Sequence, residues 1–263
     1  MEPLGLRRLL LVLAGWLALA GGLRAAEAVA PGEWGIYALR WNWVQVGTTE
    51  LRLEAGGEDE WIATLDARAN AFLRQFYDFH TTIESRFPAG VPFSRHYERH
   101  ENPAGIRHRT LFAWEPGEVR YQRNEDLRPP LALKGPVQDP LSIVYAFREG
   151  RVPRTPGTHF LPVTDGKAMV EVRLEVGQPR SVRTPAGKFQ AFPVTADFGA
   201  VRAIFARPEG ALITLWLTDD RYLFPVRLES EATIGQFNAV LEDYFLPGAG
   251  PDGQSLPARL SPL

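Results

Sequence analysis

The feature that most constrains the fold is a period of two in the hydropathy of several segments. In residues 170–176, valine and leucine alternate with charged residues, and residues 213–218 and 226–233 show the same two-residue period. A strand of this kind buries one face and exposes the other, which is typical of antiparallel sheets and not of parallel ones. Turn sequences rich in Pro, Gly and Asp separate these segments. We therefore expect an all-β protein with an antiparallel sheet.

Helical patterns are sparse. The best one covers residues 140–148, where Asp139 precedes a proline at the first helical position and apolar residues follow at spacings of three and four. We expect Asp139 to cap this helix, an interaction usually worth about 1 kcal/mol. A second short helix is expected within residues 69–76. The expected fold thus contains one or two short helices.

The first residues have the pattern of an export signal. Arg7 and Arg8 precede an apolar run over 9–20, which is shorter than the roughly 20 residues that a membrane-spanning helix needs. Small residues around Glu27 fit a cleavage site. We expect residues 1–28 to be a signal peptide, 32–246 to form a single β domain, and 247–263, which is rich in Pro, Gly and Ser, to be a disordered tail. The alternative is a retained membrane anchor, and we favour a periplasmic protein without one.

Composition excludes several classes of function. The chain has no cysteine, so it has no disulfide, no thiol nucleophile and no N-terminal lipid anchor on cysteine. The formal net charge of −2 comes without a basic stripe, so we expect no nucleic-acid partner. Neither a Gly-x-Ser-x-Gly turn nor a Gly-rich phosphate loop is present. We therefore expect no cofactor and identify no catalytic residue.

Three segments occur in a characteristic order. Residues 138–142 read Gln-Asp-Pro-Leu-Ser, residues 183–189 read Arg-Thr-Pro-Ala-Gly-Lys-Phe, and residues 215–229 join Leu-Trp-Leu-Thr-Asp-Asp to Phe-Pro-Val-Arg-Leu-Glu. In this order and spacing they resemble the bacterial family known as domain of unknown function 3108, over roughly residues 34 to 245. The resemblance implies an exported protein of Gram-negative bacteria, built as a strongly curved sheet, an open roll or an incomplete barrel. It implies no established activity.

The histidines and arginines near residue 100 raise two hypotheses. His96 and His100 lie on one face of an expected strand, and His108 follows a turn, so the three would hold a metal ion if the register placed His108 opposite His100. The alternative is a polar outer face, because the surrounding cations oppose a dication. Those cations form an arginine cluster, which suits either an anionic headgroup or an ordinary charged surface. Its members are Arg95, Arg99, Arg107, Arg109, Arg120 and Arg123.

Large aromatic residues are concentrated between residues 34 and 87. In a closed sandwich most of them would be core. In an open curved sheet, the concave face is too wide for its own side chains to fill, and this suits an apolar ligand. The candidate ligand-binding residues are Trp41, Trp43, Phe72, Phe76 and Tyr77.

The function we expect is non-enzymatic binding of an apolar or amphipathic envelope ligand, such as a lipid, in the concave face of the sheet. One alternative is a scaffold whose exposed strand edge pairs with an envelope protein. A less favoured alternative is a hydrolase of envelope glycan or lipid, with its acids among Asp219, Asp220, Glu229 and Glu231.

The export pattern predicts where the mature protein begins. We expect its first residue to lie between 25 and 31, because the short apolar run ends at small residues suited to cleavage. N-terminal sequencing of exported material measures this directly. Recovery of intact Met1 in the membrane fraction would show that the segment is retained as an anchor.

Overall fold

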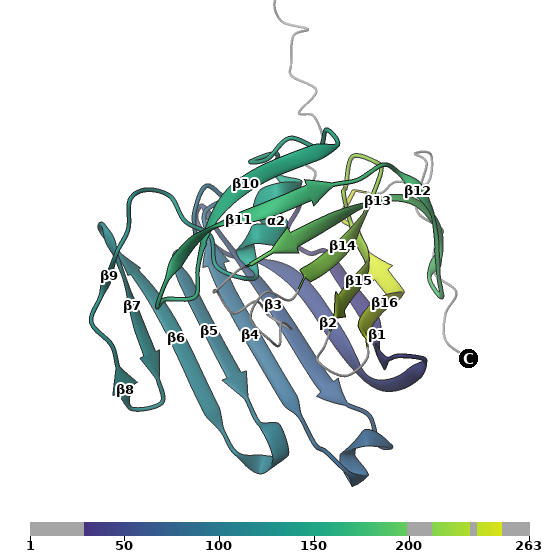
Figure 1. Cartoon of the computed structure of the whole chain (residues 1–263), viewed down its shortest axis with the longest axis horizontal. Coiled ribbons are helices and arrows are strands. Elements are labelled where there is room, and N and C mark those ends of the chain that lie inside the picture. Colours follow the sequence, from purple (N-terminus) through teal and green to yellow (C-terminus); the bar gives the residue numbers. More distant parts are fainter. Residues whose placement is uncertain (1–28, 199–211, 232–235, 249–263) are drawn as a thin grey trace, which may run out of the picture.

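The computed structural model describes residues 29–198, 212–231 and 236–248. Their strands form one antiparallel sheet with the order β10-β11-β13-β14-β15-β16-β1-β2-β3-β4-β5-β6-β7-β8, with β12 paired to β13 and β9 to β7 (Figure 1). The expected all-β, antiparallel fold is confirmed. The expected signal peptide (1–28) and residues 249–263 of the expected tail lie outside the described residues.

The first nine strands are β1 (Trp34–Trp41), β2 (Val44–Gly57), β3 (Glu60–Ala69), β4 (His80–Phe87), β5 (His96–Glu101), β6 (His108–Glu115), β7 (Glu118–Arg123), β8 (Asp126–Leu127) and β9 (Leu131–Ala132). The others are β10 (Gly157–Thr164), β11 (Met169–Val176), β12 (Arg180–Thr184), β13 (Gly187–Asp197), β14 (Leu212–Thr218), β15 (Pro225–Glu231) and β16 (Gln236–Phe245). The helical elements of the described residues are α2 (Ser142–Arg148) and the 3₁₀ turns η1 (Leu73–Gln75) and η2 (Pro103–Gly105).

The two-residue period of the sequence becomes an inner and an outer face of the sheet. In β11, Val172 and Leu174 are buried, whereas Glu171 and Arg173 are exposed. In β14, Ile213 and Leu217 are buried on the same inner face. Burial of these apolar side chains is the main favourable term in folding.

The sheet bends around α2, which lies between its two halves (Figure 1). On one side Tyr145 of α2 packs against Phe87 of β4, with ring centroids 5.5 Å apart. On the other side Phe147 packs against Phe192 of β13 at 6.3 Å. The helix is thus part of the core of an incompletely closed roll.

The two ends of the sheet meet through side chains. The turn between β10 and β11 lies against β6 and β7, the far end of the strand order, and Gly166 occupies this turn with φ +79°. A Cβ atom at Gly166 would lie 2.8 Å from a ring carbon of Phe112 and 3.0 Å from one of Tyr121. Only glycine combines this backbone conformation with so close an approach.

The helix predicted over 140–148 forms as α2, two residues shorter at its start. Asp139 caps it as expected: its Oδ1 accepts hydrogen bonds from the backbone N–H groups of Leu141 (2.7 Å) and Ser142 (2.8 Å). The second helix, expected within 69–76, is only the 3₁₀ turn η1. No helix in the described part of the chain combines the length and apolarity needed to cross a bilayer.

A buried ion pair joins α2 to the start of β1. The guanidinium of Arg148 donates to both carboxylate oxygens of Glu33, at 2.5 and 2.8 Å, and its Nε and Nη2 donate to the carbonyl oxygen of Tyr222. The side chain of Arg148 is fully buried and that of Glu33 is 4% exposed. The Arg148 guanidinium also lies over the rings of Tyr145 and Phe224. This group therefore links three segments that are distant in sequence.

Removal of one partner of this pair is expected to destabilise the protein strongly. Arg148→Met leaves the Glu33 carboxylate buried without its cation, which costs roughly 3–5 kcal/mol in the free energy of unfolding. The double variant Glu33→Gln with Arg148→Met should lose less than the sum of the two single variants. Urea denaturation of all four proteins measures this coupling. Additive losses would show that the two groups do not depend on each other.

Candidate functional site

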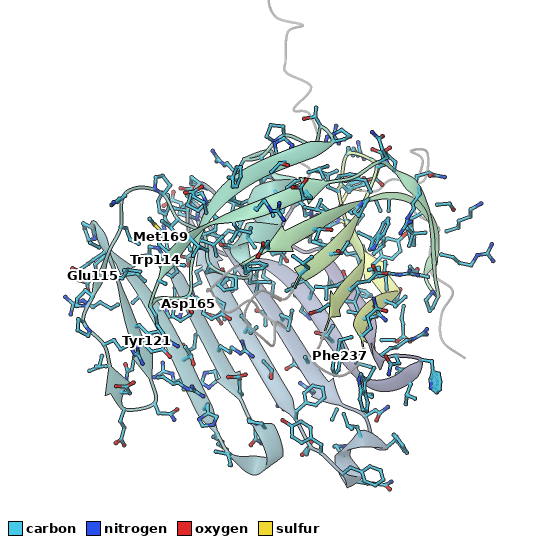
Figure 2. All side chains as sticks on the ribbon, in the orientation of Figure 1. Trp114, Glu115, Tyr121, Asp165, Met169 and Phe237 are labelled. Atoms are coloured by element: carbon cyan, nitrogen blue, oxygen red, sulfur yellow. The ribbon has the colours of Figure 1, made fainter. Side chains whose placement is uncertain are left out.

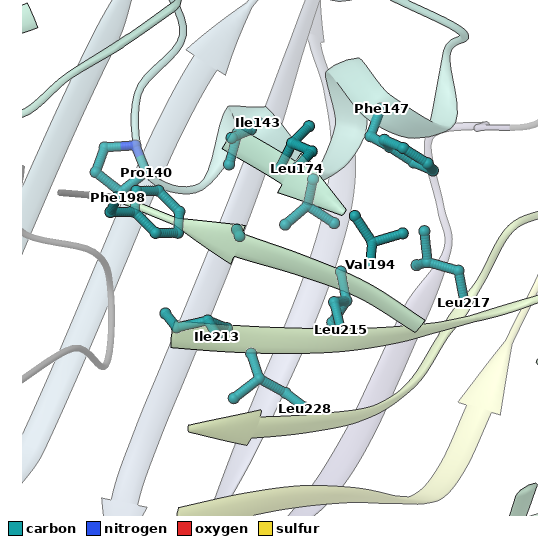
Figure 3. Close-up of a pocket in the computed structure, with 12 residues that line it drawn as sticks. Pro140, Ile143, Phe147, Leu174, Val194, Phe198, Ile213, Leu215, Leu217 and Leu228 are labelled. Atoms are coloured by element: carbon teal, nitrogen blue, oxygen red, sulfur yellow. The ribbon is translucent and has the colours of Figure 1, made fainter. Parts of the chain in front are cut away.

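An apolar pocket lies inside the bend, between α2 and the inner faces of β11, β13, β14 and β15 (Figure 3). Its volume is about 580 Å³, including the space at its mouth. All twelve lining residues are apolar. They are Pro140, Ile143, Val144, Phe147, Leu174, Val194, Ala196, Phe198, Ile213, Leu215, Leu217 and Leu228.

The strand alternation and the sheet register together create this lining. Leu215 of β14 lies directly opposite Val194 of β13 on one side and Leu228 of β15 on the other. These side chains therefore form a row across the inner face. Leu215 and Leu228 are only half-buried, as is Val144 of the helix opposite them. The pocket is thus the part of the apolar interior that the protein's own side chains leave unfilled.

The lining of the pocket is chemically uniform. None of the twelve side chains carries a hydroxyl, carboxyl, imidazole or amino group. Such a surface supplies no nucleophile and no general acid or base. It is suited to an apolar group, whose transfer from water is favourable by about 25 cal/mol per Å² of buried surface.

A hydrogen-bond network beside the pocket holds α2 and Pro140 in place. The Asp139 carboxylate accepts hydrogen bonds from the hydroxyls of Ser85 (2.5 Å) and Ser94 (2.7 Å), in addition to the two capping N–H groups. Ser142 also donates to Gln138. Burial raises the pKa of the Asp139 carboxyl, and the four hydrogen bonds oppose that rise. The Gln-Asp-Pro-Leu-Ser segment therefore attaches the helix to β4 and to the chain before β5.

A second, more polar cavity lies on the inner face of β5, β6 and β7. Its volume is about 390 Å³ including open space, and it shares Pro140 with the apolar pocket. The other lining residues are Tyr97, Arg99, Glu101, Thr110, Phe112, Tyr121, Arg123, Asp165 and Lys167. Figure 2 shows Tyr121 and Asp165 in this part of the molecule.

The aromatic residues selected from the sequence lie at one end of the sheet and not in the pocket. Trp41 and Trp43 are at the β1–β2 turn, and Phe72, Phe76 and Tyr77 surround η1. Trp43 is 80% exposed and Phe76 is 75% exposed. The side chain of Asn70 donates to the Gln45 carbonyl, which brings the η1 segment beside the start of β2. The structure therefore groups these five residues on the surface, apart from the twelve that line the pocket.

His96 and His100 both lie beside Glu98, and His108 does not join them. The register pairs His100 with Arg109 and His108 with Glu101, so the condition for a three-histidine site, His108 opposite His100, is not met. Because directly paired residues share a face, His108 is on the opposite face of the sheet from His100. Glu98 receives a hydrogen bond from Arg109 and lies 2.7 Å from the His100 ring. The hydrogen bond from Arg109, with a smaller contribution from His100, lowers the pKa of the Glu98 carboxyl to about 2. Within the described residues, no three His, Asp or Glu side chains form a metal-binding group.

Only some of the pocket residues could be predicted from the sequence. The alternation identifies Ile213, Leu215 and Leu217 as an inward face. It does not reveal that α2 stands away from this face, because that spacing depends on contacts between segments distant in sequence.

The fold and the pocket together define a class: an antiparallel roll, open along one seam, with an apolar interior pocket. A crystal structure described as a β-barrel-like protein of domain of unknown function DUF1849 from Brucella abortus has the same kind of fold. Its TM-score is 0.57 at 12% sequence identity, with 81% of this chain and 97% of that chain covered. Residues 36–242 match the model of the family described as "Protein of unknown function (DUF3108)", and the chain belongs to this family. No curated protein matches the sequence.

Loss of the Asp139 carboxylate should cost far more than a helix cap. Asp139→Ala leaves two backbone N–H groups and two serine hydroxyls without their acceptor, at roughly 1–3 kcal/mol for each buried group left unpaired. We expect a loss of at least about 3 kcal/mol by chemical denaturation. Asp139→Asn keeps one acceptor oxygen and should lose less. Equal midpoints for the Ala variant and the parent would contradict this role.

Proposed function

We propose that the protein is an exported, non-enzymatic protein of the bacterial cell envelope that binds the apolar part of an envelope ligand in the pocket between α2 and the sheet. The observation that carries this proposal is the lining: twelve apolar side chains around a volume of about 580 Å³.

The support around the pocket favours a preformed site. The Asp139 hydrogen bonds fix the start of α2, and the Arg148–Glu33 pair fixes its end. A helix held at both ends keeps its distance from the sheet, so little ordering is needed when a ligand enters. Preorganisation of this kind lowers the entropic cost of binding.

Export is supported by the sequence. The basic residues at 7–8, the apolar run at 9–20 and the small residues around 26–28 have the pattern of a signal peptide. An envelope protein with an apolar cavity encounters lipids and other amphiphiles as its most abundant apolar solutes.

Blocking the pocket should abolish uptake of an apolar molecule. Leu215→Trp places an indole in the cavity, and we expect at least a tenfold loss in affinity for the neutral fluorescent probe N-phenyl-1-naphthylamine. The matched control is Thr214→Trp, which adds the same ring to the outer face of the same strand. Fluorescence titration measures both variants, and circular dichroism establishes that both are folded.

Two outcomes decide this proposal. If Leu215→Trp binds the probe as tightly as Thr214→Trp, the pocket is not the binding site. If Leu215→Trp does not fold, Ala196→Leu fills the same cavity with a smaller change and replaces it in the comparison. Mass spectrometry of protein purified from the periplasm then identifies the natural ligand.

A further inference from the structure

The polar cavity adjoins the apolar pocket and differs from it in charge. Pro140, which precedes α2, lines both, so the two cavities are adjacent. Three cations, Arg99, Arg123 and Lys167, line the polar cavity with two acids, Glu101 and Asp165. Its formal charge is therefore +1, from three positive and two negative groups. An apolar space beside a cationic one matches the two parts of an anionic amphiphile.

The arginines of this cavity retain capacity to bind an anion. Arg99 donates through Nη2 to Glu101, but its Nε is buried without an acceptor among the described residues. A buried donor without an acceptor is costly in the free energy of folding. Arg123 is half-buried, and its side chain forms no ion pair or hydrogen bond within the described part of the chain. A guanidinium binds carboxylate or phosphate through two parallel hydrogen bonds.

The third cation, Lys167, is positioned by the β10–β11 turn, which lies at the seam where the two ends of the sheet meet. Asp165 Oδ1 accepts hydrogen bonds from the backbone N–H groups of Lys167 and Ala168, which fixes the conformation of the turn. The contact of Gly166 with the rings below places Lys167 at the cavity, with its Nζ 5.0 Å from the centre of the Tyr121 ring. The turn that joins the two ends of the sheet therefore supplies part of the polar cavity.

We propose that the ligand is a single-chain amphiphile with an anionic head, a carboxylate or a phosphate. Its chain occupies the apolar pocket, and its head binds Arg99, Arg123 and Lys167. This inference rests on the proposed function, because it uses the same apolar pocket. It also assigns a role to two members of the arginine cluster. Arg99 and Arg123 are on the inner face, whereas Arg109 and Arg120 pair with outward residues.

The test separates the head of the ligand from its chain. Dodecanoate, dodecyl phosphate and dodecanol are used in turn to displace N-phenyl-1-naphthylamine from the mature protein. We expect the two anions to act at concentrations at least ~10-fold lower than dodecanol, because only their heads form charge-assisted hydrogen bonds with the guanidinium groups. Arg123→Gln should remove this preference and leave displacement by dodecanol unchanged.

The matched control is Arg120→Gln, on the same strand but on the outer face, where Arg120 pairs with Glu115 and Glu118. It should keep the full preference for the anions. If Arg123→Gln does not fold, Lys167→Gln tests the same cavity from the opposite element. Retention of the preference in the folded inner-face variant would overturn the assignment of the head site.

Three other outcomes are informative. Equal displacement by dodecanoate and dodecanol in the parent would overturn the anionic head and leave the proposed apolar pocket intact. No binding of the neutral probe at all would overturn both. Inorganic phosphate has the head without the chain, and we expect it to displace nothing at concentrations where dodecyl phosphate does. Displacement by phosphate alone at those concentrations would identify a site for a free anion in place of an amphiphile.

Discussion

The buried ion pair of Arg148 and Glu33 is the interaction on which the arrangement of the roll depends. Two charges without water are stable only when their remaining hydrogen bonds are also made, and here the Tyr222 carbonyl accepts from the same guanidinium. The pair thereby connects α2 with the segment before β1 and with the β14–β15 turn. Because these groups meet with one geometry only, the end of the helix has a defined position inside the sheet. The pocket exists because that position leaves space between α2 and the inner faces of β11, β13, β14 and β15.

The interior is divided by chemistry along the curvature of the sheet. Beneath α2 and β13–β15 the lining is wholly apolar, whereas over β5–β7 it also carries charged side chains. In the charged part, the rings of Tyr97 and Phe112 stack with centroids 4.5 Å apart. Arg99 and Arg123 line the same cavity as these two rings. The two regions meet at Pro140, next to the buried carboxylate of Asp139.

Local patterns in the sequence predicted the strands, their faces and the capping of α2, because each depends on residues close together in the chain. Asp139 shows the limit of such reasoning: its capping bonds are to Leu141 and Ser142, but Ser85 and Ser94 are 54 and 45 residues away. Glu33 and Arg148 are 115 residues apart, and no local pattern pairs them. A period of two in the sequence predicts which face of the sheet a residue lies on. It does not predict whether the residue lies in the middle of the sheet or at the end of a strand. For this reason Trp43 and Phe76 were expected in the concavity and lie at exposed turns. The face of His108 depended on strand register, which the turn sequence did not specify.

The contact of Gly166 with Phe112 and Tyr121 also determines where the roll is mechanically weakest. Every neighbouring pair of strands along the sheet is joined by a ladder of backbone hydrogen bonds, but β10 and β8, the two ends of the order, are not joined in this way. At this seam the turn is held by ring packing and by the cation of Lys167 over Tyr121, and the edge of β10 forms two backbone hydrogen bonds with Gln138 in place of a ladder with a further strand. Packing contacts can be lost and regained without breaking a cooperative ladder, so the circumference of the roll changes most easily here. The seam borders the polar cavity. Widening the seam therefore enlarges the polar cavity before the apolar pocket.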